Sequence, residues 1–351
     1  MITETYSVNY RRFGVKNNPS RLIRRYLMDS QFCCQVLDRK KLLTGFKNFE
    51  LKDKKLIESY TKSWNIGCSD LSFANLFIWG ADGKMQYVID DDVLYIKLNF
   101  KSFPEFFWPP IPKKGSKHDY RELVCRAFEY LENKNIVPVI RNIWEPFKEI
   151  IEKSCPELDI EPAEIAWDYV YSREKLATLK GKKLHGKRNH INKFMQENPD
   201  WEYKKLVPSM YEDCIAVYDG WKESKDLSED EFANERRSVL LALTNMEELG
   251  LTGGAILLDG KIKAFTVGER LNDDMQLIHI EKADSEINGL FPMINQQYVL
   301  HECADVQYIN REEDMGVEGM RKAKRSYYPD FMVKKYFAAK GKVTEEELSE
   351  E

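Results

Sequence analysis

The stretch "TGGAILLDGKIKAFTVGERLNDDMQLIHIEKAD", residues 252–284, contains three apolar runs separated by two turn sequences. The first turn is an Asp-Gly pair at 259–260, a common two-residue hairpin connection, and the second is Asn-Asp-Asp at 272–274. Apolar runs of this length between turn residues indicate strands. The stretch therefore predicts a three-stranded antiparallel meander.

Both halves of the chain give the same order of elements, namely hairpin, helix, strand, helix and strand. In the second half, the elements after the meander lie at about 289–301, 306–309, 317–328 and 331–337. In the first half, the five elements lie at about 85–100, 119–134, 136–140, 144–154 and 167–172. We therefore predict an α+β protein built by tandem duplication. The predicted parts are a basic extension, two domains and an acidic tail, at 1–45, 46–178, 179–340 and 341–351.

Composition narrows the class of protein. A chain of 351 residues with 43% hydrophobic and 32% charged side chains has room for two ordinary cores. Its net charge of −5 excludes a uniformly basic nucleic-acid-binding surface, so a polyanion must bind a local patch. Seven scattered cysteines without a CxxC spacing predict neither a metal nor a disulfide. No apolar run approaches 18 residues, so we expect a cytoplasmic protein without a transmembrane segment.

A basic segment, "LKGKKLHGKRNHINKF" at 179–194, lies between the predicted domains and contains no acidic residue. A solvated surface run would explain the lysines. However, the protein is acidic overall, and the two glycines of the segment allow backbone amides to approach an anion. We therefore predict a phosphate or polyanion site at Lys183, Lys187 and Arg188, in which the arginine can bind bidentately.

A second charged cluster follows the predicted strand at 306–309, where sheets commonly present ligand-binding groups. The residues that we expect to line the site are Asn310, Arg311, Glu312 and Asp314. Arg321 and Lys324, on the helix behind, would hold the loop in shape. The alternative is that the carboxylates only cap the helix and pair with its cations, which leaves the rest of the set unexplained.

Four motifs resemble one known family. They are "YINREEDMGVEGMRKAKRSYYP", "HGKRNHINKF", "SDLSFANLFIW" and "IHIEKAD". Together they are similar to the family named after the carboxyl-terminal domain of phosphatidylglycerol lysyltransferase, in its soluble stand-alone branch, over roughly 45–339. The resemblance implies two tandem GCN5-related N-acyltransferase (GNAT-like) domains, akin to the Fem peptidoglycan aminoacyltransferases. This agrees with the duplication indicated by the order of elements.

The resemblance also implies an activity, the transfer of an amino acid from aminoacyl-tRNA to an acceptor. In the lysyltransferases an Asp and an Arg three residues apart grip the aminoacyl group, and the matching positions here hold His279 and Lys282. Glu281 lies between them. We expect Glu281 or His279 to be the general base and Lys282 or Arg311 to be the electrostatic partner. The basic segment would bind the RNA backbone, and the acceptor would be an amine or a hydroxyl.

Two other functions remain open. Acyl-coenzyme A is the commonest donor of this fold, but its pyrophosphate usually binds a glycine-rich turn. The corresponding turn here, "ADSEINGLFP" at 283–292, has one glycine and two carboxylates, so this reading ranks second and no other cofactor is expected. The third possibility is a module that binds RNA or an anion without catalysis, because a fold alone does not define an enzyme.

Overall fold

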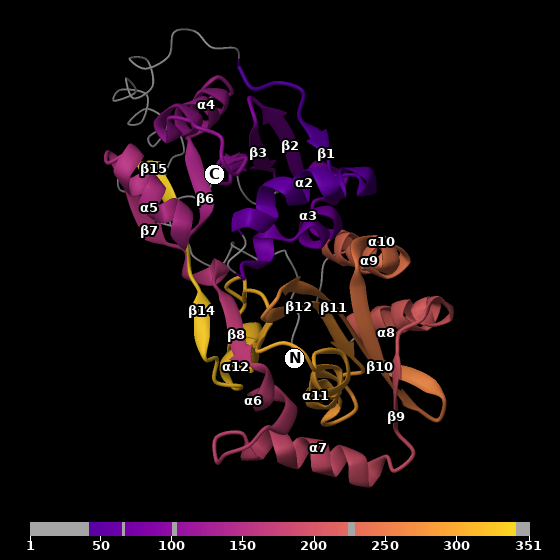
Figure 1. The fold of residues 1–351 in the computed structure, drawn as a ribbon. Coiled ribbons are helices and arrows are strands. Elements are labelled where there is room, and N and C mark those ends of the chain that lie inside the picture. The colour runs from indigo at the N-terminus through magenta and orange to yellow at the C-terminus, as the bar shows by residue number, and fades with distance from the viewer. Residues whose placement is uncertain (1–41, 65–66, 100–103, 224–228, 342–351) are drawn as a thin grey trace. The chain divides into compact units, whose positions relative to one another are not determined.

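The computed structural model describes residues 42–64, 67–99, 104–223 and 229–341. These residues form two compact units (Figure 1). The C-terminal unit consists of residues 167–333, and the described part of the N-terminal unit consists of 42–166 and 334–341. The expected basic extension, except for its last four residues, and the acidic tail after residue 341 lie outside the described residues.

The C-terminal unit is built on a seven-stranded sheet in the order β14-β8-β13-β12-β11-β10-β9. Its strands are β8 (Asp168–Ser172), β9 (Glu202–Lys205), β10 (Leu251–Leu258), β11 (Lys261–Asn272), β12 (Met275–Ala283), β13 (Tyr308–Asn310) and β14 (Phe331–Val333). The strands β10, β11 and β12 form the predicted antiparallel meander. The neighbours β12 and β13 run parallel, with α11 connecting them.

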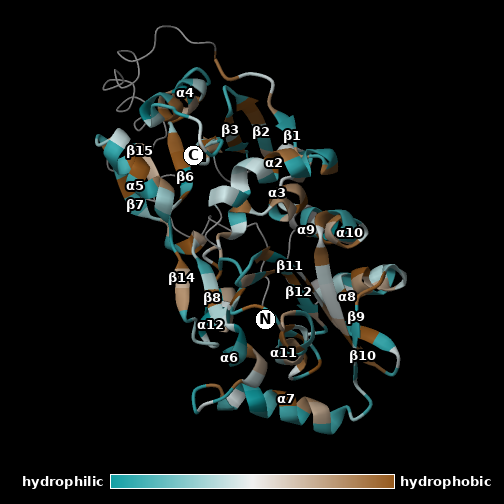
Figure 2. Cartoon of the chain, viewed as in Figure 1, coloured by the Kyte–Doolittle hydropathy of each residue, from teal (hydrophilic) through white to brown (hydrophobic). Residues whose placement is uncertain are grey.

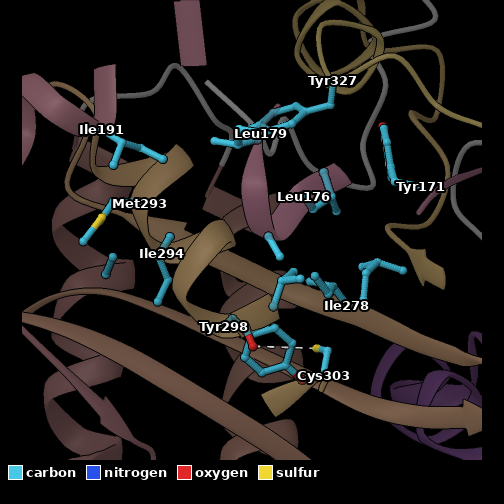
Figure 3. Close-up of a cluster of buried hydrophobic side chains, with 14 of the residues drawn as sticks. Tyr171, Leu176, Leu179, Ile191, Ile278, Met293, Ile294, Tyr298, Cys303 and Tyr327 are labelled. Atoms are coloured by element: carbon cyan, nitrogen blue, oxygen red, sulfur yellow. Dashed lines mark hydrogen bonds between the residues drawn. The ribbon is translucent and has the colours of Figure 1, made fainter. Parts of the chain in front are cut away.

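Helices cover both faces of this sheet. They are α6 (Arg173–Thr178), α7 (His185–Glu197), α8 (Tyr211–Glu223), α9 (Glu229–Thr244), α10 (Met246–Leu249), α11 (Leu290–Glu302) and α12 (Glu318–Arg325), with the 3₁₀ turn η7 (Pro208–Met210). Met293, Ile294 and Tyr298 of α11 pack in one buried core with Ile278 of β12 and Ile191 of α7 (Figure 3). The helix α8 contacts β11 and β12.

The N-terminal unit has its own eight-stranded sheet, in the order β1-β2-β3-β4-β6-β15-β7 with β5 paired to β3. Its strands are β1 (Lys47–Asn48), β2 (Met85–Asp90), β3 (Val93–Leu98), β4 (Phe106–Phe107), β5 (Ile111–Pro112), β6 (Val139–Trp144), β7 (Leu158–Pro162) and β15 (Lys335–Lys340). Its helices are α2 (Lys54–Thr61), α3 (Phe73–Trp79), α4 (Tyr120–Glu132) and α5 (Glu145–Ser154), and its 3₁₀ turns are η2 (Leu51–Asp53), η3 (Lys62–Trp64), η4 (Ser69–Leu71), η5 (Ala81–Gly83) and η6 (Glu164–Ala166).

Strand pairing divides the chain differently from the predicted domain boundaries. The strand at 168–172, expected in the first domain, is β8 and pairs with β13 and β14 in the C-terminal unit. The apolar stretch at 331–337, expected as one strand, is split between β14 and β15, and β15 lies between β6 and β7. The units therefore change over between residues 166 and 167 and again between 333 and 334, rather than near residue 178. Interstrand hydrogen bonds decide this division, and a local apolar pattern does not reveal them.

Candidate functional site

A β-bulge in β12 determines where its polar side chains point. Opposite β11, Ile280 pairs with Val267 and Ile278 pairs with Gly268, so His279 is an additional residue on β12. A Cβ at position 268 would lie 2.2 Å from the carbonyl oxygen of Leu277, and the bulge therefore requires glycine there. Beyond the bulge the alternation of faces is shifted by one residue.

The strands β12 and β13 separate close to this bulge. Their parallel pairing extends only to Leu277 and Asn310, whereas β12 continues as far as Ala283. The chain after Asn310 follows β8 instead, because the amide of Arg311 donates to the carbonyl oxygen of Tyr169 at 2.9 Å. Side chains from both strands therefore meet at the carboxyl ends of two diverging parallel strands, a common position for ligands in open sheets.

One buried ion pair spans the two strands. Arg311 Nη2 donates to Glu281 Oε1 at 2.9 Å, and the Nδ2 group of Asn295 on α11 donates to Glu281 Oε2 at 2.7 Å. Arg311 is 4% exposed and Glu281 is 5% exposed, so both ions of the pair are buried. Within the described residues, Arg311 Nη1 is buried and has no hydrogen-bond partner. The guanidinium also lies 5.0 Å from the ring centroid of Tyr327.

His279 is held between two carboxylates. Its Nδ1 lies 2.9 Å from Glu312 Oε1, and its Nε2 lies 2.9 Å from Glu269 Oε1. Burial alone would lower the pKa of His279, but the hydrogen bonds and charges of Glu269 and Glu312 outweigh burial and raise the pKa to about 10. The imidazole is therefore protonated at neutral pH and has no lone pair to accept a proton. Of the two expected bases, the geometry favours Glu281.

Lys282 lies on the face of the sheet opposite Glu281. Its Nζ donates to Glu235 Oε1 at 2.7 Å, and it lies 3.9 Å from the ring centroid of Trp221 and 5.0 Å from that of Tyr218. The side chain is 1% exposed, and burial lowers its pKa even though Glu235 acts to raise it. Because Lys282 already has a carboxylate partner beneath α8 and α9, the expected electrostatic role fits Arg311 better.

Two residues of the predicted cluster fix the loop after β13. Asn310 Nδ2 donates to Asp168 Oδ2 at 2.9 Å, while its Oδ1 accepts the amide N–H of Glu312 at 2.7 Å. Glu312 has a φ of 56°, a left-handed conformation that costs a non-glycine residue about 1 kcal/mol or more. Such strain is maintained only by surrounding contacts, so Asn310 acts here as a support for Glu312.

Asp314 is the anchor between this loop and α12. It accepts the Tyr169 hydroxyl at 2.6 Å and two guanidinium N–H groups of Arg321 at 2.8 and 3.0 Å. Its Oδ1 also accepts the Gly316 amide at 2.8 Å. Burial acts to raise the pKa of Asp314, but the hydrogen bonds from Arg321 and Tyr169 outweigh it and lower the pKa. Asp314 is therefore occupied by structural contacts.

Lys324 holds the loop from behind. Its Nζ donates to the carbonyl oxygens of Arg311 at 2.6 Å and Glu312 at 3.1 Å, and it also bonds the carbonyl of Glu313. Burial lowers the pKa of Lys324 to about 8, although the charges of Glu313 and Glu312 oppose this shift. Lys324, like Arg321, thus contacts the loop in the way expected for a residue that supports its shape.

The basic segment contributes one side chain to the neighbourhood of Arg311. Arg188 donates through Nη1 to the carbonyl oxygens of Leu179 and Gly181, the latter at 2.9 Å. Lys183 Nζ lies 5.1 Å from the ring centroid of Tyr328. Lys187 Nζ lies 4.2 Å from the ring centroid of Tyr327, the same ring that Arg311 contacts. Burial and the nearby charge of Arg311 lower the pKa of Lys187 to about 8.

The helix α7 carries most of this segment (Figure 2, in which hydrophilic residues are teal). Its buried residues, Ile191 and Phe194, attach it to the core of the C-terminal unit. The exposed lysines of the segment are Lys180, Lys182, Lys183 and Lys193. Two of them lie near carboxylates, because Lys180 Nζ is 3.7 Å from Glu174 and Lys193 Nζ is 3.5 Å from Glu197.

Sequence reasoning did not single out four partners of the site: Asn295, Glu269, Glu235 and Tyr327. One signal was available for Asn295, which is an amide within the apolar stretch "LFPMIN" of a predicted helix. Buried amides of this kind usually satisfy another polar group. The partners on β11 and α9 give no comparable signal, because charged residues at those positions suit an exposed surface equally well.

A cleft of about 460 Å³ lies at a different place in the C-terminal unit, between α8 and the β10–β11 turn. Val217, Gly220 and Trp221 of α8 line one side, and Lys263 and Asp284 line the other. Since Trp221 also covers Lys282, this cleft belongs to the face of the sheet opposite Glu281.

Among the described residues, no helix is long and apolar enough to cross a membrane.

Solved structures define the class of fold. A conserved protein of unknown function from Bacteroides thetaiotaomicron is 35% identical, with 85% of this chain and 100% of that chain covered and a TM-score of 0.75. The C-terminal domain of a putative lysylphosphatidylglycerol synthetase from Agrobacterium fabrum is 13% identical, with 84% and 93% covered and a TM-score of 0.58. FemX is 8% identical, with 84% and 97% covered and a TM-score of 0.53. The chain has the predicted α+β fold of two tandem GNAT-like domains.

The family follows from a match over most of the chain. The model described as "Phosphatidylglycerol lysyltransferase, C-terminal" matches residues 63–339. The chain therefore belongs to the phosphatidylglycerol lysyltransferase C-terminal domain family, as its motifs predict. Membership of this family supports aminoacyl transfer as the general class of reaction.

Proposed function

We propose that this protein transfers an aminoacyl group from aminoacyl-tRNA to an amine or hydroxyl acceptor. The observation that carries the proposal is the buried Glu281–Arg311 pair, placed where β12 and β13 diverge. A carboxylate held by a guanidinium and by the Asn295 amide is fixed in one orientation, which an acid–base group requires. Family membership supports the same chemistry.

The reaction requires little of the protein, because an aminoacyl ester is already activated. The acceptor nitrogen or oxygen attacks the ester carbonyl carbon, and Glu281 takes the proton that the acceptor loses. The ester C–O bond then breaks, and the terminal ribose hydroxyl of the tRNA leaves with that proton. Amide groups of β12 beyond Leu277, on the edge where its pairing with β13 has ended, would hydrogen-bond the developing oxyanion.

The other residues of the site support these steps. Lys183 and Lys187 would contact phosphates of the RNA, and Arg188 would hold the start of α7 through its carbonyl contacts. His279 would position Glu312 as a fixed cation, and Asn310, Asp314, Arg321 and Lys324 would keep the loop in place. Lys282 would act on the opposite face by neutralising Glu235.

Acyl-coenzyme A fits the site less well as a donor. In the turn between β12 and α11, Asp284 Oδ1 accepts the amide of Glu286 at 3.1 Å, so the turn's own carboxylate uses a group that a pyrophosphate would need. Lys263 Nζ lies 3.2 Å from Asp284 and neutralises that carboxylate in part. A bound pyrophosphate would also meet the carboxylate of Glu286.

The proposed function is tested with Glu281→Gln, which removes the proton acceptor but keeps an oxygen for Arg311. Release of labelled amino acids from a charged tRNA pool is measured with pooled amine and hydroxyl acceptors. We expect transfer to fall about 10²-fold or more, as for other general bases. Glu286→Gln, an exposed change in the following turn, is the matched control and should leave transfer unchanged. Wild-type protein without transfer, or undiminished transfer by Glu281→Gln, would reject the proposal.

A further inference from the structure

Arg311 has a donor that nothing in the described protein satisfies. Its Nη2 bonds Glu281, but Nη1 is buried and has no hydrogen-bond partner among the described residues. Buried polar groups in folded proteins are almost always paired, and charged donors most of all. A buried guanidinium whose Nη1 group has no partner among the described residues is therefore arranged for an acceptor that another molecule brings.

A second cation lies near the same aromatic ring. Lys187 Nζ lies 4.2 Å from the ring centroid of Tyr327, and the guanidinium carbon of Arg311 lies 5.0 Å from that centroid. No salt bridge of Lys187 is found within the described part of the chain. The charges of Arg311 and Glu281 both act on Lys187, with opposite effects on its pKa.

Two cations and one carboxylate lie at Tyr327, because Arg311 and Lys187 are positively charged and Glu281 is negatively charged. Glu312 and Glu269 both bond His279, whose positive charge neutralises one of them, so the wider cluster carries no net charge. Lys187 itself has no ion-pair partner within the described residues. A ligand with a negative charge would supply that partner.

We propose that Arg311 Nη1 and Lys187 Nζ form a binding site for one oxyanion, a carboxylate or a phosphate, beside the ring of Tyr327. The inference rests on the proposed function and deepens it, because it gives one of the substrates a negative charge close to Glu281. That charge belongs either to a carboxylate or phosphate on the acceptor, or to a phosphate near the reacting end of the donor. A neutral hydroxyl would accept one hydrogen bond from Arg311 Nη1 but would bring no negative charge to Lys187.

The site is tested by calorimetric titration of the full chain with inorganic phosphate and, separately, with acetate at neutral pH. We expect one site for at least one of these anions. Lys187→Gln, which removes a cation from a half-buried position, should weaken that binding about tenfold, as expected for loss of a charge-assisted contact. Lys193→Gln on the same helix, where the lysine is exposed and lies 3.5 Å from Glu197, is the control and should bind like wild type.

The arginine is tested by a pair of changes. Arg311→Gln combined with Glu281→Gln removes both charges of the buried pair, so no ion is left unpaired, and this variant should lose the site while it remains folded by circular dichroism. If the double variant unfolds, the titration of Lys187→Gln alone tests the proposed site. Response to phosphate alone assigns a phosphate-bearing substrate, and response to acetate assigns a carboxylate-bearing acceptor.

Two results would overturn the inference. The first is wild-type protein that binds neither anion, and the second is equal weakening by Lys187→Gln and Lys193→Gln, which would indicate diffuse attraction to α7. The titration needs no turnover, so anion binding without aminoacyl transfer would reject only the proposed function. Aminoacyl transfer by a wild-type protein that binds neither anion would reject only this site and would leave the proposed function standing.

Discussion

Lys335 on β15 and Asp70 in the 3₁₀ turn η4 form a buried ion pair with an Nζ to Oδ2 distance of 3.0 Å. Lys335 is fully buried, and the same carboxylate oxygen accepts Asn142 Nδ2 at 3.1 Å. Lys335 Nζ also lies 3.3 Å from the hydroxyl of Ser69. These contacts connect the last strand of the described chain to a turn near the beginning of the N-terminal unit.

We predict that Lys335→Ala lowers the free energy of unfolding by about 3–5 kcal/mol, because it leaves Asp70 buried without its cation. Urea denaturation followed by circular dichroism measures the loss. Lys334→Ala, a neighbouring change at an exposed position, should stay within about 0.5 kcal/mol of wild type. Equal effects of the two changes would mean that the ion pair contributes nothing beyond the packing of β15.

A pH-dependent contribution to stability is predicted for His279. Its pKa is about 10 in the folded protein and 6.5 in a model peptide, so the folded state binds its proton more tightly. The stabilisation is fully present below pH 6.5 and is lost as the pH rises through about 10. The difference in unfolding free energy between wild type and His279→Gln should therefore shrink across that window.

Nuclear magnetic resonance gives an independent check on His279. Among the five histidines of the chain, this imidazole should remain protonated on both nitrogens at pH 8. The resonances assigned by their absence in His279→Gln identify it. A titration midpoint near 6.5 would contradict the predicted shift and would restore His279 as a possible base.

The Glu281–Arg311 pair should show strong coupling in a double-mutant cycle. Arg311→Met leaves Glu281 buried and unpaired, so we expect it to cost about 3–5 kcal/mol. In the presence of Glu281→Gln the same change should cost much less, since no charge is then stranded. Denaturant unfolding of the four proteins supplies the values. Additive costs would show that the two side chains do not share one interaction.

Binding of an anion beside Tyr327 should weaken above pH 8. The pKa of Lys187 is lowered to about 8, so its positive charge disappears as the pH rises through that value. The groups that face it are Arg311, whose pKa is raised, Glu281 and Tyr327, whose pKa is also raised. Titrations between pH 6.5 and 9.5 measure the change, which Lys187→Gln should abolish. Constant affinity across this range would separate Lys187 from the bound anion.

The sequence predicts the elements of the C-terminal unit better than their partners. Turn residues and apolar runs are local, so the meander β10–β11–β12 and the helix α11 are confirmed. Whether a strand such as β15 pairs within its own half depends on long-range hydrogen bonds, which no local pattern contains.

The candidate site shows the same limit. The charged loop after β13 is recognisable because glycine and mixed charges follow an apolar strand. The positions of its members depend on contacts from far along the chain. In a regular strand, side chains three residues apart point to opposite faces of the sheet. The bulge at His279 shifts this alternation in β12, so the rule does not hold for positions 279 and 282. Burial of Arg311 likewise arises from Tyr327, Glu281 and their neighbours. The sequence of a charged loop does not indicate which of its residues will be buried.

The position of β15 between β6 and β7 determines the order in which the two units can fold during translation. The N-terminal unit is translated first, yet its sheet lacks an inner strand until residue 340 has left the exit tunnel. Residues 167–333 are continuous in sequence and can complete their own sheet earlier. Until β15 has been synthesised, the nascent chain exposes the facing edges of β6 and β7, a state that favours chaperone binding or edge-to-edge association.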